Sequence, residues 1–190
     1  MKKNSEKETN KSISSIESLQ KIIDESKKNP YDKGESKKPQ YIKNYIPGKN
    51  VIVDGMEVSN FENPGFPTFD SITNMLESLI KRGMIPLYVI LDESFPYLLN
   101  ERDYDRFSRV VKEGINLSQR KIEIVLTKNP DDTVKTLVNY ALEYNTKIVT
   151  NQDVLHSYEI LTQEKSPAQF KRQLWQIKYT IVERKIQFIV

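Results

Sequence analysis

Short apolar runs alternate with stretches of helical periodicity from about residue 49 to the end of the chain. The runs lie at 51–53, 87–91, 122–126 and 148–150. Their β-branched content and short length are typical of buried parallel strands. Between them, apolar side chains recur at helical spacing over 69–80, 104–111 and 134–142. Strands that alternate with helices form right-handed crossovers, so we predict an α/β sandwich whose mostly parallel sheet has helices on both faces.

The segments around this pattern give further local expectations. Residues 59–67 have the Asn, Pro and Gly content of a loop, and Gly83 and Gly114 follow two of the expected helices as C-cap signals. Near the end of the chain we expect a helix over 166–177. Two short runs, 179–182 and 186–190, are expected to pair as a hairpin.

The first 48 residues differ in composition from the rest. They contain 11 lysines against 7 acidic residues, whereas residues 49–190 contain 18 Lys or Arg against 19 acids. With few large apolar groups, this segment cannot offset its ordering entropy, so we expect a flexible basic tail (1–48) before one folded domain (49–190). A short amphipathic helix in the tail either packs on the domain or binds a partner. Its apolar residues are Ile13, Ile16, Leu19, Ile22 and Ile23.

The composition also excludes several classes of protein. The chain has no cysteine, which rules out disulfides and thiolate metal sites and fits a reducing compartment. No apolar run has the length of a signal peptide or a membrane span. We therefore expect no membrane partner and a cytoplasmic protein, or a nuclear one if its source is eukaryotic.

Acidic side chains follow each of the four apolar runs. Because parallel strands end at one edge of a sheet, these carboxylates are expected at the same edge, where open α/β folds bind ligands. Like charges gathered there repel unless a cation lies among them, and oxygen ligands without His or Cys suit Mg²⁺ or Mn²⁺. Any one of these acids alone could instead cap a helix or face solvent. The set is Asp54, Asp92, Glu93, Asp131, Asp132 and Asp153.

Several motifs occur in a fixed order along residues 49–190. They are Val51-Ile52-Val53-Asp54-Gly55, Leu79-Ile80-Lys81-Arg82-Gly83, Asp131-Asp132, Tyr140-Ala141-Leu142-Glu143, Ile148-Val149-Thr150-Asn151 and Phe170-Lys171-Arg172. Together they resemble the Zc3h12a-like (Regnase) ribonucleases of the NYN branch of PIN-like nucleases. The resemblance implies a PIN-like three-layer α/β/α sandwich and a metal-dependent endoribonuclease that hydrolyses single-stranded or loop RNA with Mg²⁺ or Mn²⁺.

The same resemblance implies the site. Asp54 would be the central metal ligand, and Asp131, Asp132 and Asp153 would complete a catalytic coordination shell. Two departures bear on this. Asp54-Gly55-Met56-Glu57 stands where the family usually reads Asp-Gly-Ser-Asn, and Gln152 separates Asn151 from Asp153, where the family has Asn followed directly by Asp. Possible accessory residues are Glu57, Asn151, Asp92 and His156.

Basic residues near these motifs are the candidates for RNA contact. They are Lys128, Lys171, Arg172 and Arg106. Arg102, Arg106 and Arg109 share one helix face, which either meets phosphates or is a solvated face paired with neighbouring acids. Trp175 is read as a core or dimer contact, and a homodimer stays open. The alternative function is a catalytically degenerate PIN-like domain that binds RNA or a protein partner, and a nuclease of structured DNA would share the same metal site.

Overall fold

A computed structural model describes residues 49–62, 64–165, 175–182 and 185–189 of the chain. The expected tail with its amphipathic helix therefore lies outside the described residues. So do most of the expected helix over 166–177 and the turn at 183–184. The described residues belong to one compact unit.

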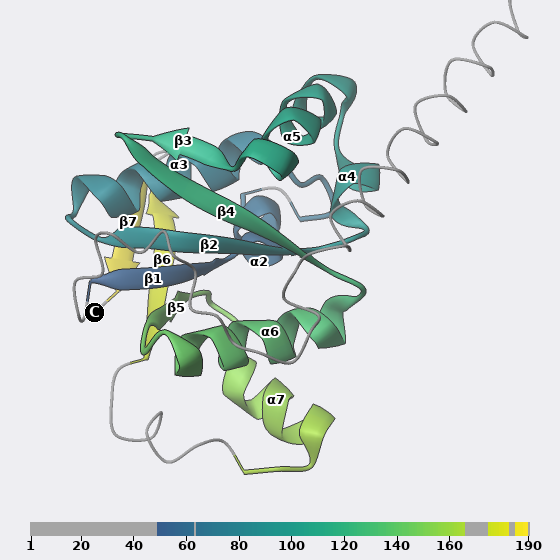
Figure 1. Ribbon diagram of the computed structural model, residues 1–190, viewed down its shortest axis with the longest axis vertical. Coiled ribbons are helices and arrows are strands. Elements are labelled where there is room, and N and C mark those ends of the chain that lie inside the picture. The colour runs from purple at the N-terminus through teal and green to yellow at the C-terminus, as the bar shows by residue number, and fades with distance from the viewer. Residues whose placement is uncertain (1–48, 63, 166–174, 183–184, 190) are drawn as a thin grey trace, which may run out of the picture. The chain divides into compact units, whose positions relative to one another are not determined.

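The described elements follow the predicted alternation of strands and helices (Figure 1). The strands are β1 (Asn50–Asp54), β2 (Ile85–Asp92), β3 (Ile115–Leu117), β4 (Arg120–Thr127), β5 (Lys147–Val149), β6 (Gln176–Val182) and β7 (Lys185–Ile189). The helices are α2 (Gly55–Asn60), α3 (Phe69–Lys81), α4 (Phe95–Leu98), α5 (Glu101–Glu113), α6 (Pro130–Glu143) and α7 (Val154–Thr162).

The strands form one sheet in the order β3-β4-β2-β1-β5-β6-β7. The five inner strands are parallel to one another, and β3 and β7 are added antiparallel at the two edges. Helices α3 and α5 lie on one face of the sheet, and α6 and α7 lie on the other (Figure 1). This arrangement confirms the predicted three-layer sandwich with a mostly parallel sheet, and it brings the ends of β1, β2, β4 and β5 to one edge.

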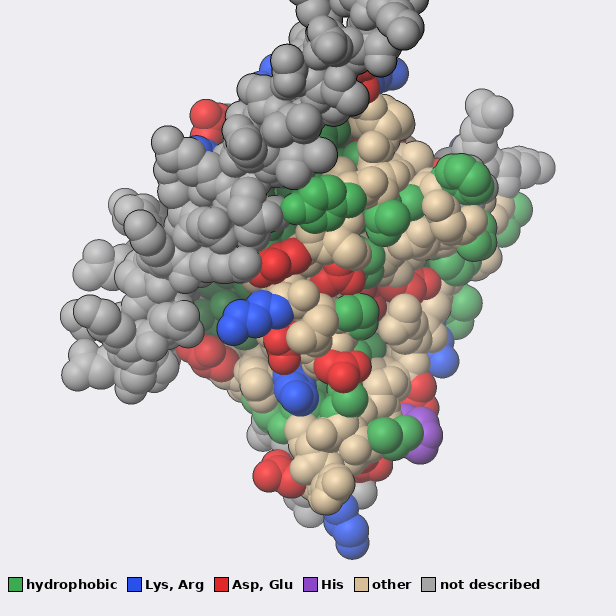
Figure 2. Space-filling model, turned by 90° about the vertical axis from the view of Figure 1, so that its right-hand side faces the viewer, with side chains coloured by type: hydrophobic (Ala, Val, Ile, Leu, Met, Phe, Trp, Pro, Cys, Tyr) green, Lys and Arg blue, Asp and Glu red, His purple; other side chains and the backbone are tan. Residues whose placement is uncertain are grey.

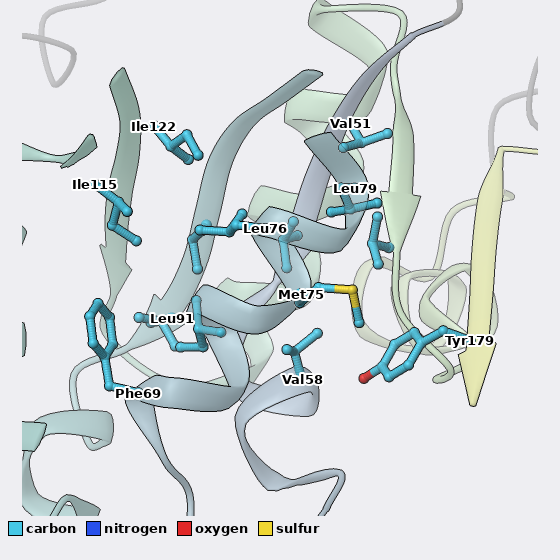
Figure 3. Close-up of a cluster of buried hydrophobic side chains, with 14 of the residues drawn as sticks. Val51, Val58, Phe69, Met75, Leu76, Leu79, Leu91, Ile115, Ile122 and Tyr179 are labelled. Carbon is cyan, nitrogen blue, oxygen red and sulfur yellow. The ribbon is translucent and has the colours of Figure 1, made fainter. Parts of the chain in front are cut away.

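The apolar face of α3 supplies much of the core on its side of the sheet. Thr68 caps the helix by accepting a hydrogen bond from the backbone N–H of Ser71. Each large apolar side chain that the helix buries fully contributes roughly 1.5–3 kcal/mol to the stability of the fold, because its surface is removed from water. Figure 3 shows these side chains facing the sheet, with Tyr179 of β6 reaching in from the side. The buried residues of the helical stripe are Phe69, Ile72, Met75, Leu76 and Leu79.

The structure also departs from the sequence-based expectations. The α7 helix was not predicted because only one of its side chains, Val154, is fully buried, so it has no clear apolar stripe. The helix expected over 166–177 is wrong at its end, since residues 176 and 177 begin β6. Helix α2 takes up residues 59 and 60 of the expected loop, and the short strand β3 was missed. The expected hairpin is confirmed by the antiparallel pairing of β6 and β7.

Candidate active site

Asp54 lies at the point where β1 ends and α2 begins. Its side chain is 3% exposed and caps α2, with Oδ1 accepting a hydrogen bond from the backbone N–H of Glu57 at 3.2 Å. Oδ2 accepts a hydrogen bond from the hydroxyl of Thr150, which follows β5, at 2.9 Å. These hydrogen bonds favour the ionised form, but burial outweighs them and raises the pKa of Asp54 to about 6.

Gly55 explains why the chain can turn at this point. A Cβ atom at residue 55 would lie 2.7 Å from side-chain atoms of Leu91 and Val89, and 2.9 Å from the carbonyl oxygen of Ile90. Only glycine therefore lets the start of α2 approach β2 this closely. The Asp-Gly sequence at the end of β1 thus places the Asp54 carboxylate directly against the parallel sheet.

Glu57 brings a second carboxylate beside Asp54. It projects from α2 and accepts a hydrogen bond from the hydroxyl of Tyr179, and Asn151 hydrogen-bonds it through both its backbone and its side chain. Partial burial raises the pKa of Glu57, and its negative charge adds to the factors that raise the pKa of Asp54. Two neighbouring, partly desolvated carboxylates make a site whose charge a cation would offset.

Strand β6 fixes the segment that follows β5. The backbone N–H of Tyr179 donates to Oδ1 of Asn151 at 3.0 Å. The Gln176 side-chain amide donates to the backbone carbonyls of Thr150 at 2.7 Å and Gln152 at 2.8 Å. This segment, in which the sequence departs from the Regnase-like pattern, is therefore held by specific contacts from β6.

The remaining predicted acids lie at the same edge but hydrogen-bond locally. Asp92 is buried and accepts from the backbone N–H of Ser94 at 2.7 Å. Asp131 and Asp132 lie in the first turn of α6, where the Asp132 carboxylate accepts from the amide of its capping residue, Asn129. The parallel strands that precede these acids end at one edge of the sheet, as predicted, but the hydrogen bonds of the acids are made within their own segments.

Asp153 is exposed and caps α7, since its Oδ1 accepts from the backbone N–H of the exposed His156 at 3.1 Å. Across the described parts of the chain, no three His, Asp or Glu side chains are grouped so that they could hold a metal ion. The coordination shell of Asp54, Asp131, Asp132 and Asp153 therefore stays a prediction.

The donors around Asp54 still fit a hard divalent cation. Asp54 and Glu57 offer carboxylate oxygens, and Thr150 adds a hydroxyl oxygen next to them. Mg²⁺ characteristically uses one or two protein carboxylates and completes its shell with water and substrate phosphate. The chemistry of this donor set thus suits Mg²⁺ or Mn²⁺ rather than a metal that prefers sulfur or nitrogen.

The basic candidates for RNA contact have different environments. Lys128 is exposed in the connection between β4 and α6, whereas Lys171 and Arg172 lie outside the described residues. Arg106 forms ion pairs with Asp70 and with the buried Asp103, the latter at 3.5 Å.

The guanidinium of Arg106 also lies over the ring of Phe69, 5.5 Å from its centroid. Because Phe69 and Asp70 belong to α3 and Asp103 belongs to α5, Arg106 joins these two helices. Its charge is therefore already paired within the domain. On the same helix, Arg109 Nε donates to the carbonyl of Asp105 at 3.1 Å.

Sequence reasoning assigned no role to Thr150, Gln176 or Tyr179. Thr150 occurs within one of the motifs quoted above and Tyr179 begins the expected run 179–182, but both are ordinary residue types for a strand. Nothing in the local pattern shows that their polar atoms reach Asp54 and Glu57, which are distant in sequence. Trp175 is half-buried, and its carbonyl accepts from the backbone N–H of Ile148 at 2.8 Å.

The sheet order and the helices on both of its faces define a PIN-like α/β fold. Two solved structures of the nuclear protein-only RNase P 2 (PRORP2) of Arabidopsis thaliana are similar. One has 15% sequence identity, a TM-score of 0.56, and covers 96% of this chain and 36% of its own. The other has 14% identity, a TM-score of 0.55, and covers 95% and 35%. The chain thus spans about a third of the length of these structures.

Other comparisons found no counterpart. No protein-family model matches the chain, and no curated protein matches it. In the described ranges, none of the helices has the length and apolar character needed to cross a bilayer.

Proposed function

We propose that this protein is a metal-dependent endoribonuclease that hydrolyses phosphodiester bonds of single-stranded or loop RNA. The observation that carries the proposal is the buried Asp54 carboxylate next to Glu57, at the edge where the parallel strands end. The comparisons support it, because the similar solved structures bear the name of a protein-only RNase P. The ordered motifs that resemble those of Regnase-like ribonucleases point in the same direction.

The chain's own residues prepare this site in three ways. Asp54 and Glu57 supply negative charge that would hold Mg²⁺ or Mn²⁺. When bound, such an ion lowers the pKa of a water and offsets charge on the phosphodiester. Thr150 and the backbone N–H of Glu57 orient the Asp54 carboxylate. Asp131, Asp132 and Asp153 follow strands that end at the same edge of the sheet. We keep the sequence-based assignment of these three acids as further ligands, directly or through water.

The surface around the site supports a single-stranded substrate. Figure 2 shows the face at which the parallel strands end, where acidic groups gather across the middle and hydrophobic side chains lie beside them. Exposed apolar residues on the connections after β1 and β2 include Phe66, at 70% exposure, and Tyr97, at 52%. Aromatic side chains of this kind stack on unpaired bases irrespective of sequence. Lys128 supplies a positive charge on the same edge.

The test is cleavage of an end-labelled single-stranded RNA by the full chain with Mn²⁺, Mg²⁺ or EDTA. We expect cutting that requires the metal and leaves 5′-phosphate ends. Asp54→Asn keeps the volume of the side chain but removes its charge, so we expect it to abolish cutting. A matched control is Asp105→Asn on α5, an exposed acid away from the strand ends, which should cut like the wild type.

The alternative function is a degenerate PIN-like domain that binds RNA or a protein without cutting. The observation that favours it is that no three-acid group assembles in the described ranges, together with Gln152 after β5. Binding of single-stranded RNA without cleavage in any of these metals would establish this alternative. Cleavage confined to structured DNA would instead keep the metal site and change the substrate.

A further inference from the structure

We propose that Tyr179 is a positioning residue that holds Glu57 as the second carboxylate of the reaction centre, in the role that the family pattern gives to the acid after β5. This inference rests on the proposed metal-dependent function and assigns the residues that complete its site. Nothing in the local sequence joins these two residues, because 122 positions separate them.

Tyr179 contacts both elements that form the site. Its hydroxyl donates to a carboxylate oxygen of Glu57 on α2, and its backbone N–H donates to Oδ1 of Asn151 after β5 at 3.0 Å. Asn151 in turn hydrogen-bonds Glu57 through its backbone and side chain. One residue of β6 therefore holds the Glu57 carboxylate directly and also through the segment between β5 and α7.

The ring of Tyr179 gives this arrangement a rigid support. The side chain is 2% exposed and packs against Phe61, with ring centroids 4.9 Å apart. Figure 3 shows the ring extending from β6 past Met75 of α3, with its hydroxyl directed toward α2. A buried tyrosine with an apolar body and a bonded hydroxyl places a polar contact accurately, because packing fixes its two side-chain torsions.

Asp153 is placed differently. It is exposed and its carboxylate caps α7 through the backbone N–H of His156. Glu57, by contrast, lies one turn after Asp54 on α2, where its backbone N–H donates to Asp54 Oδ1 at 3.2 Å. Where the family usually has Asn, this chain has Glu57, which thus brings a carboxylate from α2 to Asp54. The acid after β5, Asp153, instead caps α7.

The experiment measures Mn²⁺ binding directly, from the loss of the free-ion electron paramagnetic resonance signal, and RNA cleavage as a function of Mn²⁺ concentration. Tyr179→Phe keeps the ring and the backbone N–H but removes the hydroxyl. Replacement of residues that orient metal ligands typically weakens metal binding by about 10- to 100-fold. We expect Tyr179→Phe to lose Mn²⁺ affinity to that extent. Saturating Mn²⁺ should restore most of the cleavage rate, and Glu57→Gln should lose at least as much affinity.

Tyr88→Phe is the matched control, because Tyr88 is buried and its hydroxyl bonds Tyr144 rather than the site. It should bind Mn²⁺ like the wild type. Unchanged Mn²⁺ affinity in Tyr179→Phe, in a protein that cuts RNA as the wild type, overturns the positioning role alone. The same holds if Asp153→Asn abolishes binding and Glu57→Gln does not. A wild-type protein that neither binds Mn²⁺ nor cuts RNA overturns this role and the proposed function together.

Discussion

Thr150 and Asp54 are 96 residues apart in sequence, yet the Thr150 hydroxyl donates a hydrogen bond to Asp54 Oδ2 at 2.9 Å. The parallel pairing of β1 with β5 aligns Val53 with Val149, so the two following residues lie side by side where these strands end. Both side chains are buried. This contact therefore partly stabilises a carboxylate that has little access to water.

Replacement of Thr150 by valine tests the value of that hydrogen bond. Thr150→Val should lower the free energy of unfolding by about 1–3 kcal/mol, because a buried carboxylate loses a donor while the volume of the side chain is kept. Urea unfolding at pH 7 without divalent metal measures the change. Thr146→Val is the control, since Thr146 is also buried and its hydroxyl oxygen has no partner among the described residues. Equal losses in the two variants would contradict the prediction.

The raised pKa of Asp54 predicts a definite pH dependence of stability. The folded state holds the Asp54 proton up to about pH 6, whereas an unperturbed aspartate carboxyl releases it near pH 3.8. Stability from this group is thus fully present below pH 3.8 and is lost as the pH rises through 6. The shift corresponds to about 3 kcal/mol.

The measurement that checks this loss is the difference in unfolding free energy between wild type and Asp54→Asn, in EDTA, from pH 4 to pH 7. Relative to the variant, the wild type should become less stable by on the order of 3 kcal/mol over this range. A cation bound at Asp54 favours the ionised form, so Mn²⁺ should stabilise the wild type at pH 7 and leave the variant unchanged. Parallel pH curves for the two proteins would rule out the raised pKa.

We expect Arg106 to stabilise the fold rather than to bind RNA. Arg106→Ala leaves the buried Asp103 without its ion-pair partner and uncovers the Phe69 ring, so we expect a loss of about 1–3 kcal/mol. Arg102→Ala, on the same helix but exposed, should change stability by less than about 0.5 kcal/mol. Urea unfolding and RNA-binding titrations of both variants provide the comparison. Weaker RNA binding with unchanged stability would show that Arg106 contacts phosphate instead.

Gly55→Ala tests how tightly the end of β1 approaches β2. The added methyl group would meet Leu91, Val89 and the Ile90 carbonyl at less than 3.0 Å, and overpacking of this kind costs about 1–3 kcal/mol. Because the methyl group would displace α2 relative to the sheet, we also expect weaker RNA cleavage. Thermal unfolding and the cleavage assay measure the two effects, and wild-type behaviour in both would show that the backbone relaxes freely there.

Much of the fold follows from the sequence because its signals are local. The helical spacing of Phe69, Ile72 and Leu79 predicts α3, and the short β-branched run at 51–53 predicts β1. Where the local signal is weak, prediction fails. Helix α7 buries only Val154, and the residues that begin β6 were assigned to a helix.

By itself, the sequence determined that strands alternate with helices and that Asp54, Asp92, Asp131 and Asp153 lie where strands end. Periodicity and the right-handedness of crossovers fix these features from neighbouring residues alone. Only the tertiary structure decided which polar groups meet. Tyr179 reaches Glu57, and Thr150 reaches Asp54, because β5 lies next to β1 and β6 lies next to β5 in the sheet. That lateral order comes from the packing of distant segments, which no local pattern in the chain records.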